Sequence, residues 1–356
     1  MPSIEISWMR CVNCISKLAL ISILVVQGCD GRSGGGGGTN PPPGNPPVQN
    51  PPADFTISGK VTYERVFFDA GGVGLDYSTR QNLPARGIRV DLVDAQGNIF
   101  STVQSDAQGN YSFTLDADQA GDYRVLANAR LAVADIRVTD NTSGNSLYQL
   151  QGGLLPSGTQ SSVRNLNASI GWGTEAFLTD RAAAPFAILD TVYQGIQRLE
   201  AGTGGAFSGT SLPDTELRWS VNNRPTPGER TQEDLVNGDI GSSFYSSGLG
   251  VIYLLGAANN DTEEFDQHVI MHEWIHYLQN ALSRSDSMGG NHSFSNRLDL
   301  RLAFAEGMAT GLAAILLDDP LYRDSSGNNQ GDEFFSRWNL FPVPLWVGIQ
   351  SPPCRG

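Results

Sequence analysis

Short stretches of alternating apolar and polar residues fill the chain between residues 54 and 130 and predict antiparallel β-structure. Five such stretches fall at 55–63, 88–93, 99–103, 111–115 and 123–127. The sequence Asp-Ala-Gln-Gly-Asn occurs at 94–98 and again at 106–110, and Gly followed by Asn supplies the positive backbone angles that hairpins need. Short strands at this spacing predict a small β-sandwich.

Helical spacing replaces this alternation in the second half of the chain. Apolar side chains recur every three or four positions at 182–199, 261–282 and 297–317, which predicts three helices. We place the N-cap of the middle helix at Asp261 or Thr262, because acidic residues then occupy its first turn, where the helix dipole favours them.

The N-terminus has the pattern of an export signal. Basic residues precede the apolar run 18–26, which is too short to cross a bilayer. Cys29 follows Val-Gln-Gly, an arrangement that resembles the cleavage site of bacterial lipoproteins, in which this cysteine is lipidated. Met9 is an alternative start to Met1 and would give a more typical signal.

A glycine run followed by prolines makes up residues 29–53 and predicts a flexible, extended tether. The chain then divides into a signal at 1–28, this tether, a β-sandwich domain at 54–130 and a second domain at 131–356. This organisation predicts a multidomain α+β protein that is exported and anchored by lipid, either on the periplasmic side of the inner membrane or at the cell surface.

Composition narrows the class of partner. The formal net charge of −14 argues against nucleic acid or an anionic lipid surface. Cys11 and Cys14 lie inside the predicted signal, and acylation would occupy Cys29, so Cys354 would be the one free thiol of the mature chain. The fold must therefore rely on its core rather than on a disulfide.

The four histidines of the chain all lie between positions 268 and 292. His272 and His276 enclose Glu273 in the pattern His-Glu-x-x-His, and positions i and i+4 share one helix face, so both imidazoles can reach one metal ion. In zinc peptidases with this pattern, Zn²⁺ acidifies a bound water and the glutamate takes its proton. The alternative is a pair of hydrogen-bonded core histidines beside a surface glutamate.

A catalytic zinc takes three protein ligands, so a third is expected downstream. A metzincin continuation would need Gly at 279 and His at 282, but the chain has Gln279 and Leu282, which excludes that class. His292, Asp299 and Glu306 remain as candidates. Glu306 is the one acid in the core of the last predicted helix, and its small neighbours allow close approach of a second helix, so we predict Glu306 as the ligand.

Taken together, His272-Glu273-x-x-His276 and the downstream Ala-Glu306-Gly-x-Ala resemble the gluzincin type of zinc metallopeptidase. The resemblance implies a zincin-like domain that holds Zn²⁺ with His272, His276 and Glu306. It also implies that Glu273 is the catalytic base and that the substrate is a polypeptide. No cofactor other than zinc is implied.

The resemblance covers residues 248–317 and implies that the apolar stretch 250–256 is the edge strand that binds the substrate backbone. The interval between His276 and Glu306 is longer than in the best-known gluzincins, which leaves Asp299 open as a ligand. The group that stabilises the transition state is not identified by sequence, and His292 is the weak candidate for it.

The predicted β-sandwich also resembles a known module. Ser-Gly-Lys-Val at 58–61, Val-Asp-Leu-Val-Asp at 90–94 and Ser-Asp-Ala-Gln-Gly-Asn-Tyr-Ser-Phe at 105–113 are similar to the carboxypeptidase regulatory-like, transthyretin-like domain. The resemblance implies a spacer without chemistry of its own, with ligand binding as the alternative.

The sequence thus predicts a membrane-tethered zinc metallopeptidase that hydrolyses peptide bonds. The alternative is a catalytically inactive surface lipoprotein that binds a polymer or a protein. Residues 338–356 contain one charged residue and no clear periodicity of apolar positions. The segment after the last predicted helix is also short, so we expect the second domain to be incomplete at its C-terminus. Cleavage preference, endo- or exopeptidase action and oligomeric state are not specified.

Overall fold

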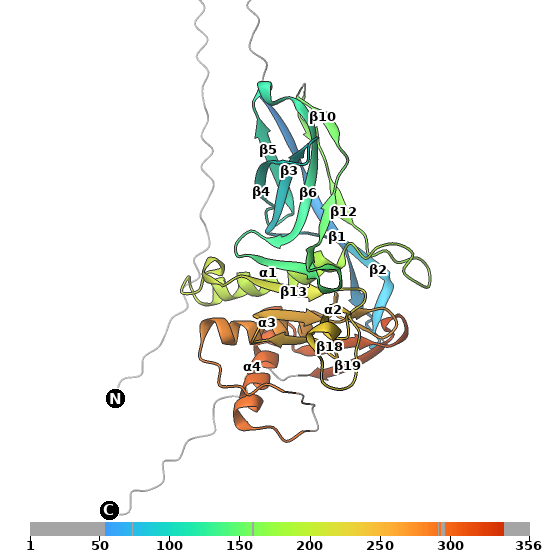
Figure 1. Cartoon of the computed structure of the whole chain (residues 1–356), viewed down its shortest axis with the longest axis vertical. Helices are drawn as coiled ribbons and strands as arrows, with labels where there is room; N and C mark the ends of the chain where they lie inside the picture. Colours follow the sequence, from blue (N-terminus) through green and yellow to red (C-terminus); the bar gives the residue numbers. More distant parts are fainter. Residues whose placement is uncertain (1–53, 73, 159, 291, 293–295, 338–356) are drawn as a thin grey trace, which may run out of the picture. The chain divides into compact units, whose positions relative to one another are not determined.

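Residues 54–337 are described by a computed structural model, except residues 73, 159, 291 and 293–295 (Figure 1). Most of the regular structure in this part of the chain lies in three β-sheets, accompanied by four α-helices. The α+β class predicted from the sequence is confirmed at this level. The predicted signal, tether, lipidated Cys29 and unusual C-terminal segment lie outside the described residues.

The first sheet is organised around one long strand. Its five strands are β1 (Phe55–Phe68), β2 (Leu75–Pro84), β5 (Asn110–Leu115), β11 (Ser162–Val163) and β12 (Leu166–Ala168). β1 pairs antiparallel with β2 and β5 and parallel with β11 and β12.

The second sheet is the largest. Its ten strands are β3 (Ile88–Asp94), β4 (Ile99–Gln104), β6 (Gly121–Leu131), β7 (Ile136–Asp140), β8 (Ser146–Leu147), β9 (Gln149–Gln151), β10 (Leu155–Ser157), β13 (Thr215–Trp219), β14 (Phe244–Ser246) and β15 (Val251–Leu254). The order β14-β15-β13-β7-β6-β3-β4 makes β14 one edge of this sheet. β7, β13 and β15 run parallel, whereas β14 pairs antiparallel with β15.

Burial along the strands follows the alternation in the sequence. In β5, Tyr111, Phe113 and Leu115 are buried while Ser112 and Thr114 are exposed. These side chains share one apolar core with residues of β1, β3 and β6. A buried aliphatic or aromatic side chain contributes about 1.5–3 kcal/mol relative to an exposed one, so the alternation sets which face of each strand turns inward. The five predicted strands are present as β1 and β3 to β6.

The boundary predicted between residues 130 and 131 does not coincide with a break in the structure. β11 and β12, which follow that boundary by some thirty positions, pair with β1, and β9 and β10 pair with β6. The second sheet also continues from β6 through β7 to β13. Strand pairing over long sequence separations, which local periodicity does not reveal, joins the two predicted domains within one compact unit.

The third sheet and the helices complete the described part. The sheet contains β16 (Gly256–Ala257), β17 (Asp261–Thr262), β18 (Leu321–Ser326) and β19 (Asp332–Arg337). The helices are α1 (Ala184–Gly202), α2 (Gln232–Val236), α3 (Gln267–Leu282) and α4 (Leu300–Leu317). Four short 3₁₀ turns lie at Ala117–Gln119, Asn141–Ser143, Gly209–Ser211 and Asn328–Gln330.

α1 and α3 approach each other closely at Gly195. A Cβ atom at this position would lie 2.7 Å from the ring of Trp274 and 3.0 Å from the end of Met271. Both of these α3 side chains are fully buried. The missing side chain of Gly195 therefore lets α1 support the helix that carries His272 and His276.

The start of α3 differs from the prediction. Asp261 and Thr262 form β17 instead of a cap, and the helix begins after Asp266. Glu263 and Glu264 are buried side chains between these two elements rather than acids in a first helical turn. Glu264 forms a buried ion pair with Arg181 at 2.8 Å, and this long-range partner accounts for its position.

α4 packs against α3, and several of its small residues are buried, among them Ala305, Ala309 and Ala313. Its other face is exposed and apolar, with Leu300 85% and Phe304 72% accessible. By length and hydropathy α4 would suffice to cross a membrane, but apolar core helices of soluble proteins meet the same criterion.

Candidate metal centre

His272 and His276 lie one turn apart on α3 and turn their rings toward the same point. Their Nε2 atoms are 3.0 Å apart, and the ring centroids are 4.7 Å apart. The four-residue spacing on an α-helix dictates this shared face. The sequence predicted this pairing, and the structure places the two side chains accordingly.

Glu306 enters the same space from α4. Its Oε2 atom lies 3.1 Å from Nε2 of His272 and 3.3 Å from Nε2 of His276. Donors about 2.0–2.1 Å from a tetrahedral Zn²⁺ are separated by roughly 3.3 Å, so the three atoms have the spacing of ligands to one such ion. One oxygen of Glu306 and one nitrogen of each histidine all lie within 4.8 Å of one another.

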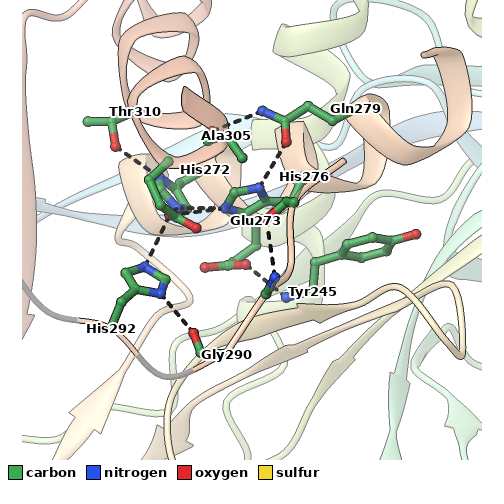
Figure 2. A network of polar contacts seen from close by, with 12 residues as sticks. Tyr245, His272, Glu273, His276, Gln279, Gly290, His292, Ala305 and Thr310 are labelled. Carbon is green, nitrogen blue, oxygen red and sulfur yellow. Dashed lines mark hydrogen bonds and ion pairs between the residues drawn. The ribbon is translucent and has the colours of Figure 1, made fainter. Parts of the chain in front are cut away.

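The outer nitrogen of each imidazole has its own partner (Figure 2). Nδ1 of His272 lies 3.1 Å from Oγ1 of Thr310, and Nδ1 of His276 lies 3.2 Å from Oε1 of Gln279. Gln279 in turn donates from Nε2 to the carbonyl oxygen of Ala305 at 2.9 Å. Hydrogen bonds to the outer nitrogen orient a histidine and direct Nε2 toward a metal, so this donor set fits a zinc ion.

Thr310 and Gln279 were not predicted as part of the site, although spacing held a signal for both. Thr310 lies four residues after Glu306 on α4, and Gln279 lies three residues after His276 on α3. Residues at these spacings share a helix face. In the sequence, Gln279 is notable only as the residue that stands where the metzincin pattern requires glycine.

Glu273 lies beside the candidate ligand atoms and is held by a strand. Its Oε2 atom accepts a hydrogen bond from the backbone N–H of Tyr245 in β14 at 2.8 Å (Figure 2). The side chain of Tyr245 accepts a further hydrogen bond from Nδ2 of Asn280 at 3.0 Å. The edge strand of the second sheet thus orients the carboxylate that the sequence predicts as a base.

The polar groups of the site shift one another's pKa values. Burial alone would raise the pKa of Glu306, but hydrogen bonds from His272 and His276 outweigh it and hold this pKa below the ordinary range. Burial alone would lower the pKa of His276, but its hydrogen bond to Glu306 and the nearby charges of Glu273 and Glu306 raise it. The site therefore favours an ionised carboxylate facing the imidazoles.

The two alternative third ligands differ in position. Asp299 caps α4, with Oδ1 accepting a hydrogen bond from the backbone N–H of Arg301 at 3.0 Å. Nε2 of His292 lies 3.2 Å from Oε2 of Glu306, and its Nδ1 lies 3.0 Å from the carbonyl oxygen of Gly290. Among the described residues, neither side chain belongs to the set of mutually close donors.

His268 belongs to the packing around the site. Its Nε2 atom lies 3.1 Å from the carbonyl oxygen of Asp319, and its ring lies 5.5 Å from that of Tyr322. This buried histidine joins α3 to the segment that follows α4.

The edge strand predicted at residues 250–256 was misplaced. β15 occupies most of that stretch, is buried at all four positions, and lies between β13 and β14. The edge is β14, which holds Glu273 through Tyr245. An apolar run is typical of an interior strand, and the less regular sequence of β14 hid its role.

Comparisons with known proteins do not assign the chain to a family. No family model matches the chain, and the curated proteins contain no match. Among solved structures, the chain is similar to a DUF3823 family protein from Parabacteroides merdae, with 18% identity and a TM-score of 0.19 over 32% of this chain. The chain spans 45% of that protein.

The assignment to the gluzincin type was wrong. No family model matches the chain, so neither that group nor the carboxypeptidase regulatory-like module is supported. A five-residue pattern plus one glutamate describes a local donor set and does not specify a family. What remains is the geometry of His272, Glu273, His276 and Glu306 themselves.

Proposed function

We propose that this chain hydrolyses peptide bonds with the aid of a Zn²⁺ ion held by His272, His276 and Glu306. The observation that carries the proposal is the convergence of these three side chains from two helices at ligand spacing. Two imidazoles and a carboxylate form a donor set of catalytic zinc, which leaves a position open for water or substrate. Closed structural zinc sites favour cysteine, and the described residues contain none.

Glu273 is the proposed general base. A Zn²⁺ ion held by these residues would polarise the scissile carbonyl and make water acidic enough to be used near neutral pH. Glu273 then takes a proton from the attacking water and delivers it to the leaving amine nitrogen. The hydrogen bond from the N–H of Tyr245 fixes the direction of this carboxylate before substrate binds.

β14 is the proposed docking strand for the substrate. Within the part of the chain that the structure describes, it pairs with β15 on one side only, and Tyr245 connects its backbone to Glu273. An extended peptide can add to such an edge through main-chain hydrogen bonds, which brings a backbone carbonyl near the base. Together with the parallel strands β7, β13 and β15 and helices α1 and α3, this arrangement supports a zincin-like lobe as part of the proposal.

Export and membrane attachment through Cys29 belong to the same proposal and rest on the sequence of residues 1–53. A polypeptide on the outer side of the membrane is the corresponding substrate class. The acidic net charge of −14 supports the exclusion of nucleic acid as a partner.

Metal analysis combined with a peptide-library digest tests the proposed function. The purified chain should contain stoichiometric zinc and cleave library peptides, and a chelator should abolish cleavage until zinc is restored. Glu273→Gln provides the matched control, because it keeps the ligand set and removes the base. Stoichiometric zinc without cleavage of any library peptide would instead support the inactive binding protein.

A further inference from the structure

A second cluster of possible metal ligands lies apart from the histidines. Asp261 in β17, Glu263 in the segment before α3, and Asp324 in β18 each place a carboxylate oxygen within 4.8 Å of the others. The pairing of Asp261 with Ser326 brings β17 and β18 together at this point. None of the three residues belongs to the candidate zinc centre.

Two oxygen atoms of this cluster are buried without a hydrogen-bond partner. Glu263 is 3% exposed, and its Oε2 atom has none among the described residues. Its Oε1 atom accepts a hydrogen bond from Oγ of Ser243 at 2.8 Å, so the carboxylate is fixed while its second oxygen remains unsatisfied. Oδ1 of Asp261 is likewise buried and unpartnered. An unsatisfied buried carboxylate oxygen is unfavourable unless a cation or a proton compensates it.

The cluster also has no counter-charge within the described residues. Asp261, Glu263 and Asp324 form no ion pair with a lysine, arginine or histidine there. The neighbouring Arg181 is engaged with Glu264 at 2.8 Å. Asp266, also buried, accepts hydrogen bonds from the N–H and Oγ of Ser325 at 2.8 Å and is a further acidic side chain nearby.

The pKa values of the carboxyl groups reflect this arrangement. Burial, followed by repulsion from Asp324 and Glu264, raises the pKa of Asp261 to about 7. Burial raises the pKa of Asp324 to about 6, and the pKa of Glu263 lies well above its usual value for the same reason, with repulsion from Asp261 and Asp324 adding to it. These directions agree with the geometry, in which buried carboxylate oxygens lie close together and two of them have no hydrogen-bond partner among the described residues.

We propose that Asp261, Glu263 and Asp324 bind a Ca²⁺ ion that ties β17 to β18. The ligand atoms are all carboxylate oxygens, which are preferred by hard cations, and the absence of imidazole or thiolate in this set disfavours zinc. Ca²⁺ accepts irregular arrangements of six to eight oxygens, whereas Mg²⁺ requires near-ideal octahedral geometry and retains several waters. A buried, irregular set of carboxylates favours Ca²⁺.

The position of this site gives it a structural consequence. Glu263 precedes α3, which carries His272 and His276, and Asp324 lies in the strand that follows α4, which carries Glu306. A cation bound by both segments would hold the start of α3 to the strand β18, which follows α4. The calcium site does not depend on the proposed hydrolysis, because its ligands and its role in stability are separate from the zinc ligands.

Calorimetry on the full chain tests the proposal. The protein is stripped of metal, reloaded with stoichiometric zinc, and heated with and without CaCl₂, with MgCl₂ at the same concentration as comparison. Calcium at saturation should raise the Tm by about 5 °C or more, and magnesium should raise it less. Glu263→Gln and Asp324→Asn should lose this shift, whereas Asp118→Asn, which removes an exposed charge elsewhere, should retain it.

Direct binding keeps the test decisive if the variants fold poorly. Tb³⁺ added to the wild-type chain should give luminescence sensitised by nearby aromatic residues such as Tyr322 in β18, and CaCl₂ should displace it. Asp261→Asn should weaken both signals. A wild-type Tm unchanged by calcium, or terbium emission that calcium does not displace, would show that protons rather than a cation neutralise the cluster.

Discussion

Oε2 of Glu306 lies 3.1 Å from Nε2 of His272, although the two residues are 34 positions apart in the sequence. The contact exists because α4 packs against α3, with alanines of α4 such as Ala305 and Ala309 buried. The candidate metal centre is therefore a property of the packed helix pair, and its integrity can be tested separately from its chemistry.

Replacing Glu273 with glutamine should abolish most hydrolysis without releasing zinc. The amide cannot accept the proton of the attacking water, and general base catalysis typically contributes about 10²–10⁴-fold. The measurements are the kcat for a library-derived peptide and zinc content by elemental analysis. Retained turnover in this variant would remove Glu273 from the proposed role.

Replacing His276 with alanine should release the zinc, whereas replacing His292 with alanine should leave zinc stoichiometric. His276 belongs to the set of mutually close donors. His292 contacts Glu306 but is not a member of that set. Elemental analysis of both purified variants, with circular dichroism to confirm folding, makes the comparison. Equal zinc in the wild type and His276→Ala would contradict the ligand assignment.

Arg181→Met should destabilise the fold by about 3–5 kcal/mol, because the buried carboxyl of Glu264 would lose its ion-pair partner and would have to take up a proton or stay unpaired. The side chains of this pair are only 4% and 1% exposed. Urea unfolding measures the loss, and Arg284→Met provides the control. Arg284 pairs with Asp286 at the surface, so its loss should change the free energy of unfolding by less than about 0.5 kcal/mol.

The double variant Arg181→Met with Glu264→Met refines the same test. Removing both charges should recover much of the loss, since apolar groups of similar size can replace a buried ion pair at little cost. A double variant as unstable as the single one would indicate that packing, rather than the unpaired charge, causes the effect.

His268 should make the fold less stable as the pH falls. Burial lowers the pKa of His268 below its ordinary value, with the Asp319 carbonyl and carboxylate partly opposing this and Arg323 adding to it. The unfolded chain then binds a proton near pH 6.5 while the folded chain resists it. Stability from this group is complete above that pH and declines below it, by at most about 1.4 kcal/mol per pH unit.

Urea unfolding of the wild type and of His268→Gln between pH 7.5 and 5 checks this expectation. The difference between the two free energies of unfolding should change with pH in the stated direction, because other titrating groups are common to both proteins. Parallel profiles would show that His268 does not titrate differently in the folded and unfolded chains.

Local pattern was sufficient for some elements of this protein. The alternation of apolar residues located β1 and β3 to β6, and the four-residue interval between His272 and His276 placed both rings on one face of α3. Glu306 was recognisable as the acid within an otherwise apolar helix. In each case the information lies within one element, where backbone geometry alone relates sequence spacing to direction in space.

Tertiary structure decided the rest. The pairing of β11 and β12 with β1, the edge position of β14, and the burial of Glu263 and Glu264 all depend on partners far away in the sequence. Periodicity states which face of an element is apolar, but it does not state which other element covers that face. The amino-acid sequence by itself therefore determined that the two histidines share one helix face, while packing of α3 on α4 and of β17 on β18 decided which carboxylates meet.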